Sequence, residues 1–408
     1  MHQAIQMSDT LWYLGSSDRR LAKFENCHPV PLGISYNSYL VMDEKTVLLD
    51  TVDHSICGVF LENIKSVLNG RPLDYIIVNH MEPDHCATLA EVLLRYPEAT
   101  VVGSAKTHAM IKQFFGELNL QGKVMQVKEN DTLSTGRHNF RFILAPMVHW
   151  PEVTVTYDET DKILFSADAF GTFGALSGNL YADQLNFGDF ELSEMRRYYS
   201  NIVGKYGVQV QALLNKAAGL DIQMICPLHG PVWRVANKIQ WLIEKYSRWA
   251  TYRPEDNEVV IFYASIYGGT ENAAEVLANA LGERKIKNIK MYDVSVTDVS
   301  YLVSEAFRAS HLVFASATYN NEIFPYMEGL LRELAAHNLQ NRSIALVENG
   351  SWAPVSGKKM SELFSSMKNM NFLQDTVTLK SRGHEEQRLQ LLALADTLAE
   401  SVFASEHR

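Results

Sequence analysis

Cysteine is scarce in this sequence, and no two cysteines have the spacing of a metal-binding motif. The 408 residues contain four, namely Cys27, Cys57, Cys86 and Cys226. Because none of them forms a C-x-x-C pair, a Cys-rich zinc ribbon and a rubredoxin-type iron centre within this chain are excluded. Few and scattered cysteines also fit a reducing compartment, in which each is a small buried apolar residue.

Long apolar runs and excess positive charge are lacking as well. No run approaches the roughly 18 apolar residues of a membrane span, and no apolar segment follows a basic N-terminus. The formal net charge of -10 argues against nucleic-acid binding or processing, because phosphate neutralisation needs a basic face. With 47% hydrophobic and 21% charged residues, we expect a soluble, cytoplasmic protein with neither nucleic-acid nor membrane partners.

The chain is too long for one ordinary core, so two domains are expected. Up to about residue 250, short apolar strands are mixed with helices. The runs SYNSYLVMD and KTVLLDTV predict a hairpin, and a long helical segment is expected over about 191–218. This mixture predicts an α/β domain over 1–250, in which two sheets pack together with helices outside.

The polar segment TYRPEDNE, residues 251–258, is the predicted linker. Beyond it, apolar strands alternate strictly with helical patterns, as in EVVIFYAS, KNIKMYDV, HLVFASAT and RSIALVEN. FLQDTVTLK, near 372–380, is the predicted fifth strand, and the last helix is expected over about 384–402. Five strands with crossover helices predict a doubly wound parallel sheet over 259–408.

The stretch NHMEPDHCATL, residues 79–89, crowds four potential metal ligands into six residues. They are His80, Glu82, Asp84 and His85, and they follow the apolar run DYIIV, where loops commonly carry chemistry. Imidazole and carboxylate ligands without thiolate suit iron, manganese or zinc. Taken alone, the stretch could also be a hydrophilic turn.

Three further polar residues follow apolar strands later in the chain. They are His149 in APMVHWPE, Asp168 in LFSADAFG and His229 in CPLHGPVW. A lone histidine at a strand end is more often a hydrogen-bonded structural residue than a ligand. Because all three are expected at the same rim as the first cluster, we predict that they belong to one metal site.

A second candidate site lies in YASIYGGTEN, residues 263–272, which joins a strand to a helix. Hydroxyls and free backbone N–H groups at a helix N-terminus bind anions, and glycine lets the backbone approach a phosphate. The loops ASATYNNEIFP and ENGSWAP, after the third and fourth strands, should complete the pocket. No G-x-G-x-x-G with an acidic residue about 20 positions on is present, so NAD and FAD are disfavoured.

The order His-x-Glu-x-Asp-His, then a distant His, Asp and His, resembles the metallo-β-lactamase fold, most members of which carry zinc and have histidine in place of Glu82. Together with the flavodoxin-like C-terminal half, it resembles the flavodiiron proteins (A-type flavoproteins). The resemblance implies a metallo-β-lactamase-like αββα sandwich followed by a flavodoxin-like five-stranded sheet. It also implies that His80, Glu82 and His149 bind one iron, that Asp84, His85 and His229 bind the other, and that Asp168 bridges them.

The C-terminal half resembles short-chain flavodoxins, which bind FMN at three loops. The residues that this resemblance assigns to FMN are Ser265, Ile266, Tyr267, Gly268, Gly269, Thr270, Ala317, Thr318, Tyr319, Asn320, Asn349, Gly350, Ser351 and Trp352.

The resemblance implies an oxidoreductase that reduces O2 to water, NO to N2O, or both, with no catalytic residues beyond the iron ligands. FMN and a di-iron centre hold two electrons each. Reduction of O2 to water needs four electrons, whereas reduction of two NO to N2O needs two. The electron count is therefore compatible with either gas as the substrate. The chain has no rubredoxin-like Cys cluster, so a separate rubredoxin or flavin reductase would donate the electrons. The family implies head-to-tail homodimers, or dimers of such dimers, in which one subunit's FMN lies beside the other's metal site.

Two alternatives remain open. The chain could be a zinc-dependent hydrolase of the metallo-β-lactamase fold with a flavodoxin-like redox-sensing domain. Hard carboxylates such as Glu82 stabilise ferric iron and argue against it. Alternatively, the chain could be an electron carrier whose first domain is only structural. Retained gas consumption after replacement of His149 or Asp168 would support that reading.

Overall fold

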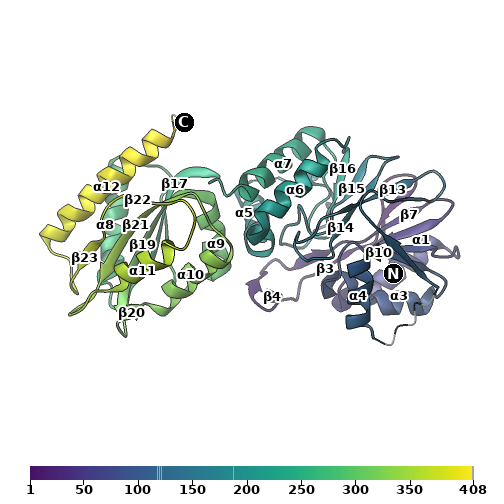
Figure 1. Ribbon diagram of the computed structural model, residues 1–408, viewed down its shortest axis with the longest axis horizontal. Helices are drawn as coiled ribbons and strands as arrows, with labels where there is room; N and C mark the ends of the chain where they lie inside the picture. The colour runs from purple at the N-terminus through teal and green to yellow at the C-terminus, as the bar shows by residue number, and fades with distance from the viewer. Residues whose placement is uncertain (117, 119, 121, 187, 407–408) are drawn as a thin grey trace. The chain divides into compact units, whose positions relative to one another are not determined.

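The computed structural model describes residues 1–116, 118, 120, 122–186 and 188–406. The chain divides into two compact units, and Figure 1 shows the elements of each. The N-terminal unit comprises Met1–Tyr199 and Val208–Ser247, and the C-terminal unit comprises Ser200–Gly207 and Arg248–Arg408. Helix α7 (Ala236–Ala250) ends where the predicted linker begins, whereas strand β17 (Asp256–Ala264) starts within that linker.

The first sheet of the N-terminal unit has seven strands, and its centre confirms the predicted hairpin. β7 and β8 are antiparallel, whereas β8, β9, β10 and β11 run parallel. The helices between the parallel strands are α1 (Cys57–Leu68), α2 (Pro83–Cys86), α3 (Leu89–Arg95) and α4 (Ala105–Phe114). In order across the sheet, the strands are β1 (Ile5–Gln6), β2 (Leu11–Tyr13), β7 (Tyr39–Met42), β8 (Thr46–Leu49), β9 (Tyr75–Ile77), β10 (Thr100–Ser104) and β11 (Val124–Val127).

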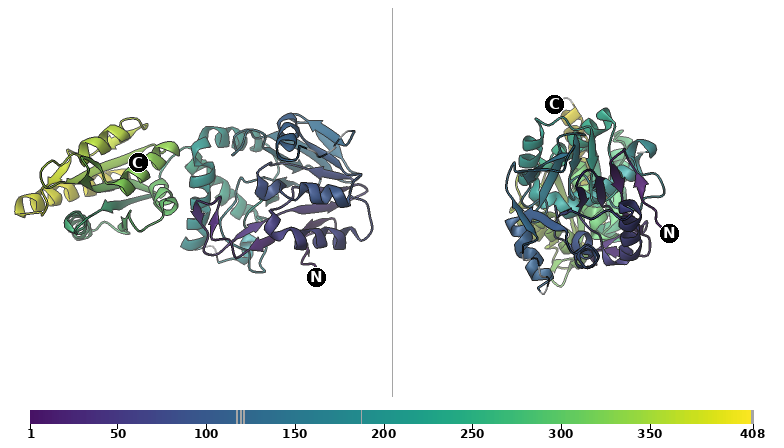
Figure 2. Two further views of the ribbon diagram at one scale, coloured as in Figure 1. Left: turned by 90° about the horizontal axis from the view of Figure 1, so that it is seen from below. Right: turned by 90° about the vertical axis from the view of Figure 1, so that its right-hand side faces the viewer.

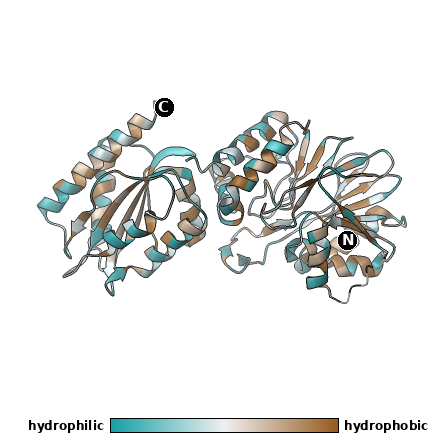
Figure 3. Ribbon diagram, in the orientation of Figure 1, coloured by the Kyte–Doolittle hydropathy of each residue, from teal (hydrophilic) through white to brown (hydrophobic). Residues whose placement is uncertain are grey.

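The second sheet of this unit has five strands and packs face to face against the first. Its strands are β12 (Thr132–Ser134), β13 (Asn139–Leu144), β14 (Thr154–Asp158), β15 (Ile163–Phe165) and β16 (Met224–Cys226). Buried apolar residues of both sheets, such as Leu49 and Ile77 from one and Phe140 and Phe165 from the other, form a single core. The hydropathy colouring of Figure 3 shows brown residues on these strands. The predicted pair of packed sheets is confirmed.

Two short two-stranded sheets lie in the first 40 residues. One pairs β3 (Ser16–Asp18) with β6 (Ile34–Tyr36), and the other pairs β4 (Lys23–Phe24) with β5 (His28–Pro29). β6 overlaps the start of the predicted run SYNSYLVMD, but the other three strands were not predicted, because two or three residues are too few to show a period-2 pattern.

The helix expected over 191–218 is interrupted. It consists of α5 (Asp189–Tyr198), a π-helical turn (Tyr199–Val203), a 3-10 turn (Gly204–Tyr206) and α6 (Gly207–Ala217). The Tyr252 hydroxyl donates to the Gly204 carbonyl at 2.9 Å and accepts from the Gly207 N–H at 3.2 Å. These contacts replace regular helical hydrogen bonds, so the predicted helical segment is confirmed, but it is not one regular α-helix.

The C-terminal unit is the predicted doubly wound parallel sheet. The strand order is β18 (Lys290–Asp293), β17, β19 (Ala309–Tyr319), β21 (Arg342–Asn349) and then β22 and β23. Side chains alternate along β19. Val313 and Ala315 pack in the core formed with α8 (Gly269–Glu283) and α12 (Glu385–Glu406), whereas the ring of Phe314 lies 4.9 Å from that of Phe364. Phe364 ends α11 (Ser356–Phe364) on the opposite face, where α9 (Val299–Arg308) and α10 (Pro325–Ala336) also pack.

The fifth strand is broken into two pieces. β22 (Met370–Phe372) pairs with Arg342–Ile344, and β23 (Val377–Leu379) pairs with Val347–Asn349. Between the two paired regions, the edge segment that contains β22 and β23 covers five positions (372 to 377), whereas β21 covers only three (344 to 347). The two extra residues must bulge out, so one continuous strand over 372–380 is impossible.

Two further features complete the C-terminal unit. β20 (Glu322–Ile323) pairs antiparallel with β19, and α12, yellow in Figures 1 and 2, lies on the outside of the unit. Among the described residues, no helix combines the length and the apolar character that crossing a membrane requires.

Candidate functional site

Seven polar side chains meet at one rim of the N-terminal unit, where strands end. His80 follows β9, and Glu82 precedes the short helix α2, which carries Asp84 and His85. Pro83 occupies the first turn of α2, where its missing N–H is not needed. The remaining three follow β13, β15 and β16, and they are His149, Asp168 and His229. All seven predicted metal ligands are buried and converge there.

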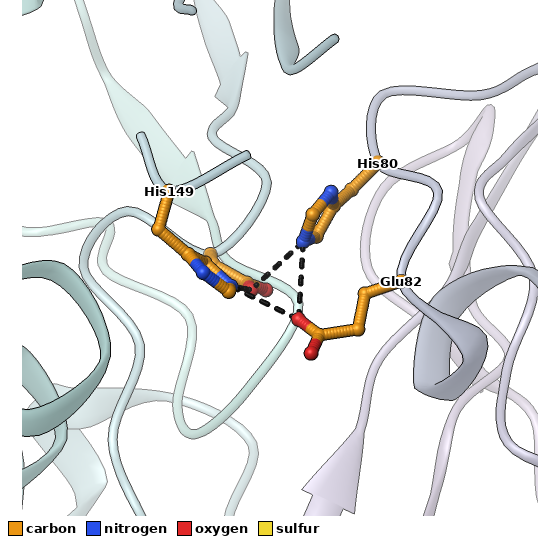
Figure 4. A group of neighbouring side chains, drawn as sticks. His80, Glu82 and His149 are labelled. Atoms are coloured by element: carbon orange, nitrogen blue, oxygen red, sulfur yellow. Dashed lines mark hydrogen bonds and ion pairs between the residues drawn. The ribbon is translucent and has the colours of Figure 1, made fainter. Parts of the chain in front are cut away.

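The first group consists of His80, Glu82, His149 and Asp168, whose ligand atoms all lie within 4.8 Å of one another. Figure 4 shows His80, Glu82 and His149 pointing toward a common centre. Glu82 Oε2 lies 2.9 Å from His149 Nε2 and 3.3 Å from His80 Nε2. A carboxylate and two imidazoles therefore face one point.

The second group consists of Asp84, His85 and His229. Asp84 Oδ2 lies 3.1 Å from Nε2 of both His85 and His229. The two Nε2 atoms are only 3.0 Å apart. His85 thus points into the site together with the other ligands.

Asp168, a member of the first group, also faces the second group. Its Oδ2 lies 3.0 Å from His149 Nε2 and 3.4 Å from His80 Nε2. Its Oδ1 lies 3.0 Å from His85 Nε2 and 3.8 Å from His229 Nε2. One oxygen faces each group, so this carboxylate could contact a cation held by each of them.

The chemistry of these residues fits two hard or borderline cations. Both oxygens of Asp84 and Oδ1 of Asp168 are buried and make no hydrogen bond with any described residue. Asp84 Oδ2 and Asp168 Oδ1 face imidazoles of the same site, and buried carboxylates without hydrogen bonds are costly unless a cation neutralises them. Four imidazoles and three carboxylates, with no thiolate among them, form a ligand set that suits iron.

The electrostatics of the site favour ionised carboxylates. Burial alone would lower the pKa of His85, but Asp84 and Asp168 outweigh it and raise this pKa to about 10. Burial likewise opposes the charge on His149, yet Asp168 and Glu82 raise its pKa to about 9. A bound cation takes the place of these imidazole protons, since imidazole coordinates in its neutral form.

Two groups outside the ligand set orient the imidazoles. Glu152 Oε1 lies 2.7 Å from His80 Nδ1 and accepts the Met81 N–H at 2.8 Å. The Ser35 carbonyl lies 2.7 Å from His229 Nδ1. Both contacts leave Nε2 free to face the site. Neither Glu152 nor Ser35 was predicted from the sequence. For Glu152, the only local indication of a role at the site was its position three residues after His149.

Aromatic rings surround His229. The ring centroids of Phe24, Tyr36 and Tyr198 lie 5.3, 5.8 and 5.4 Å from that of His229. The Tyr198 hydroxyl is buried and makes no hydrogen bond with any described residue. These rings limit the access of water to the second group.

A cavity of about 810 Å³ lies in the C-terminal unit. It is lined by all fourteen residues that the sequence analysis assigned to FMN. Six further residues also line it, and the sequence analysis did not assign them; they are Asn272, Asn321, Ala353, Ser381, Arg382 and Gly383.

The geometry of this cavity suits a flat ring with a phosphate tail. Gly268, at φ 83°, donates its N–H to Ser265 Oγ at 3.0 Å and precedes the first turn of α8. The side chains of Tyr267 and Trp352 are 98% and 92% exposed, so their faces are open to stacking. Asn349 Oδ1 is buried and makes no hydrogen bond with any described residue, as expected of an acceptor reserved for a ligand.

Comparisons with known proteins agree with both halves. Residues 34–230 match the model of the ODP family of beta lactamases, and residues 261–377 match the flavodoxin model. The rubredoxin-oxygen oxidoreductase of Megalodesulfovibrio gigas is 31% identical over 98% of this chain and 99% of its own length. The anaerobic nitric oxide reductase flavorubredoxin of Salmonella arizonae is 31% identical over 93% of this chain and 78% of its own length.

The structural comparison leads to the same group of proteins. The flavodiiron protein from Giardia intestinalis has the same fold, with a TM-score of 0.90, 24% sequence identity and coverage of 98% of this chain and 97% of that one. Combined with 31% identity over nearly the whole length of the Megalodesulfovibrio relative, this likeness shows that the chain belongs to the flavodiiron protein family.

Proposed function

We propose that this protein reduces O2 to water, NO to N2O, or both, at a di-iron centre supplied with electrons through FMN. The observation that carries the proposal is the pair of ligand groups, with Asp168 facing both, in a chain that also has a flavin-type cavity. The names of the two relatives support one gas each, O2 for the oxygen oxidoreductase and NO for the nitric oxide reductase.

The residues that would hold the irons follow from the two groups. His80, Glu82 and His149 would bind one ion, and Asp84, His85 and His229 the other, with Asp168 shared. When bound, the irons supply open coordination positions and electrons to the gas, and FMN relays electrons to them. Glu152 fixes the His80 ring, and the Ser35 carbonyl fixes the His229 ring, so that each presents Nε2 to the centre.

The fourteen residues of the first three cavity loops would bind FMN. The backbone N–H groups at the start of α8 and the hydroxyls of Ser265 and Thr270 would face its phosphate. Tyr267 and Trp352 offer exposed ring faces to the isoalloxazine.

The partners and the assembly form the finer part of the proposal. The electron donor is a separate protein, a rubredoxin or a flavin reductase, and the first of these is supported by the name of the Megalodesulfovibrio relative. The chain works as a head-to-tail homodimer, or a dimer of such dimers, in the cytoplasm, without nucleic-acid or membrane partners.

The zinc-hydrolase alternative is not favoured. Glu82 lies 2.9 Å from His149 Nε2 and so occupies a ligand position in the first group. A hard carboxylate at this position favours ferric iron over hydrolytic zinc chemistry.

The test uses the purified full chain. Iron and flavin are quantified, the protein is reduced without oxygen, and it is then mixed with O2 or NO while the flavin absorbance is followed. We expect about two irons and one FMN per chain, with rapid reoxidation. Asp168→Asn should lose iron and gas consumption, whereas Asp183→Asn, a carboxylate paired with Arg234 outside the centre, should keep both. Protein that contains zinc, or neither iron nor flavin, would contradict the proposal.

A further inference from the structure

The flavin-type cavity has a fourth wall, beyond the three loops after β17, β19 and β21. Ser381, Arg382 and Gly383 also line it, and they follow β23, the second piece of the broken fifth strand. The resemblance to flavodoxins, which bind FMN at three loops, does not predict this fourth wall.

The fourth wall is held firmly against two of the other loops. The Ser381 carbonyl accepts from Asn349 Nδ2 at 3.0 Å, and Ser381 Oγ donates to Ser351 Oγ at 2.8 Å. On the other side, a Cβ atom added to Gly269 would lie 2.4 Å from the Ser381 carbonyl oxygen. The chain at Ser381 therefore touches the start of α8, where the N–H groups of the first loop gather.

Arg382 is the one charged residue among the twenty described residues that line the cavity. Several other arginines of this unit are paired with carboxylates: Arg284 with Asp396, Arg308 with Glu305, and Arg388 with Glu385. Among the ion pairs between described residues, none involves Arg382, and its side chain is exposed. An uncompensated cation thus lies beside an otherwise neutral pocket.

We propose that Arg382 binds the phosphate of FMN and so selects the phosphorylated flavin over riboflavin. The inference rests on FMN as the cofactor of the proposed function. The phosphate is dianionic, and the first loop offers it only N–H groups and hydroxyls, while Glu271 in the first turn of α8 repels it. The guanidinium supplies the missing positive charge, and its planar fork can donate two hydrogen bonds to one phosphate.

The test compares two flavins on the full-length protein after its FMN has been removed. Binding of FMN and of riboflavin is titrated by the quenching of flavin fluorescence. Arg382→Gln should weaken FMN binding about 10- to 100-fold, the range expected for losing a hydrogen bond to a charged group, and should leave riboflavin binding unchanged. Arg382→Lys should retain part of the preference for FMN.

The matched control is Arg388→Gln, which removes an arginine of the same unit that does not line the cavity. It should leave both affinities unchanged. High salt should reduce the difference between wild type and Arg382→Gln, because the lost contact is ionic.

Two outcomes would overturn the assignment. An equal loss for both flavins would mean that Arg382 acts on the ring or on the shape of the loop, and unchanged affinity for both would mean that it faces solvent. A wild-type apoprotein that binds neither flavin would instead remove the cofactor from the proposed function itself, so the two failures can be distinguished.

Discussion

Glu152 determines which nitrogen of His80 faces the metal position. Its Oε1 lies 2.7 Å from His80 Nδ1, and the side chain is buried. Glu152→Gln keeps the shape but weakens the hydrogen bond, so we expect iron affinity to fall about 10- to 100-fold. Iron per chain, measured after dialysis against a series of chelator concentrations, checks this. Glu159→Gln, a carboxylate just after β14, should have no effect, and FMN content should stay the same in both variants.

His311 gives the C-terminal unit a pH-dependent stability. Burial lowers its pKa from 6.5 to about 4, and its ring nitrogens lie 2.7 and 2.9 Å from the hydroxyls of Ser310 and Ser401. The unfolded chain takes up this proton between pH 6.5 and 4 while the folded chain does not. The stabilisation is therefore present above pH 6.5 and decreases as the pH falls, by about 3 kcal/mol at pH 4.

The substitution His311→Gln should remove this part of the pH dependence. Urea unfolding of the full chain, followed by the fluorescence of released flavin, should show a shallower decline between pH 6.5 and 4 than in wild type. His384→Gln, which replaces an exposed histidine of the same unit, serves as the control and should keep the wild-type slope. The same slope in His311→Gln would assign the decline to other groups.

The metal ligands at strand ends could be predicted from the sequence, whereas the residues that contact the two sites from distant sequence positions could not. Glu82 and Asp168 follow apolar runs, so sequence order alone placed them at one rim. Glu152 lies 72 positions from His80, and Arg382 enters the flavin cavity only because β23 ends beside β21. Such contacts depend on tertiary packing, for which a single sequence offers no local pattern.

At the scale of elements, the start of α8 decides whether the flavin cavity can form. A Cβ atom on Gly269 would lie 2.4 Å from the Ser381 carbonyl and 3.1 Å from Asn349 Nδ2. Gly269→Ala should therefore push two walls apart, at a cost of about 1–3 kcal/mol, and weaken FMN binding while iron content is unchanged. Gly282→Ala, near the other end of α8, meets nothing within 4 Å and should leave flavin binding intact. A flavin titration of both variants checks this.

Helices and strands could be predicted wherever the hydrophobic pattern was long, whereas interruptions within a helix or a strand could not. The alternating strands and helices of the C-terminal unit appear in their expected order. The helix expected over 191–218 is interrupted because Tyr252, distant in sequence, hydrogen-bonds to Gly204 and Gly207. The fifth strand is split because it carries two residues more than its partner, and only the observed register reveals this.

At the scale of the whole molecule, the proposed head-to-tail homodimer makes a prediction about mixed subunits. Asp168→Asn should abolish the metal centre and leave FMN in place. Gly269→Asp should abolish FMN binding through both the close contact with Ser381 and repulsion of the phosphate, and it should leave the metal centre in place. Each variant alone should be inactive in gas reduction.

Mixing the two variants tests whether electrons pass from the FMN of one subunit to the irons of the other. If one subunit's FMN serves the other subunit's irons, each mixed dimer has one working pair of sites. Random assembly makes half of the dimers mixed, so the unfractionated mixture should regain about a quarter of the wild-type activity and the purified mixed dimer about half. If electrons pass within one chain, no mixed dimer has a complete pair and the mixture stays inactive. Co-expression with two different affinity tags, purification over both, and measurement of O2 and NO consumption by the mixed dimer distinguish these outcomes, and persistent inactivity would rule out the head-to-tail arrangement.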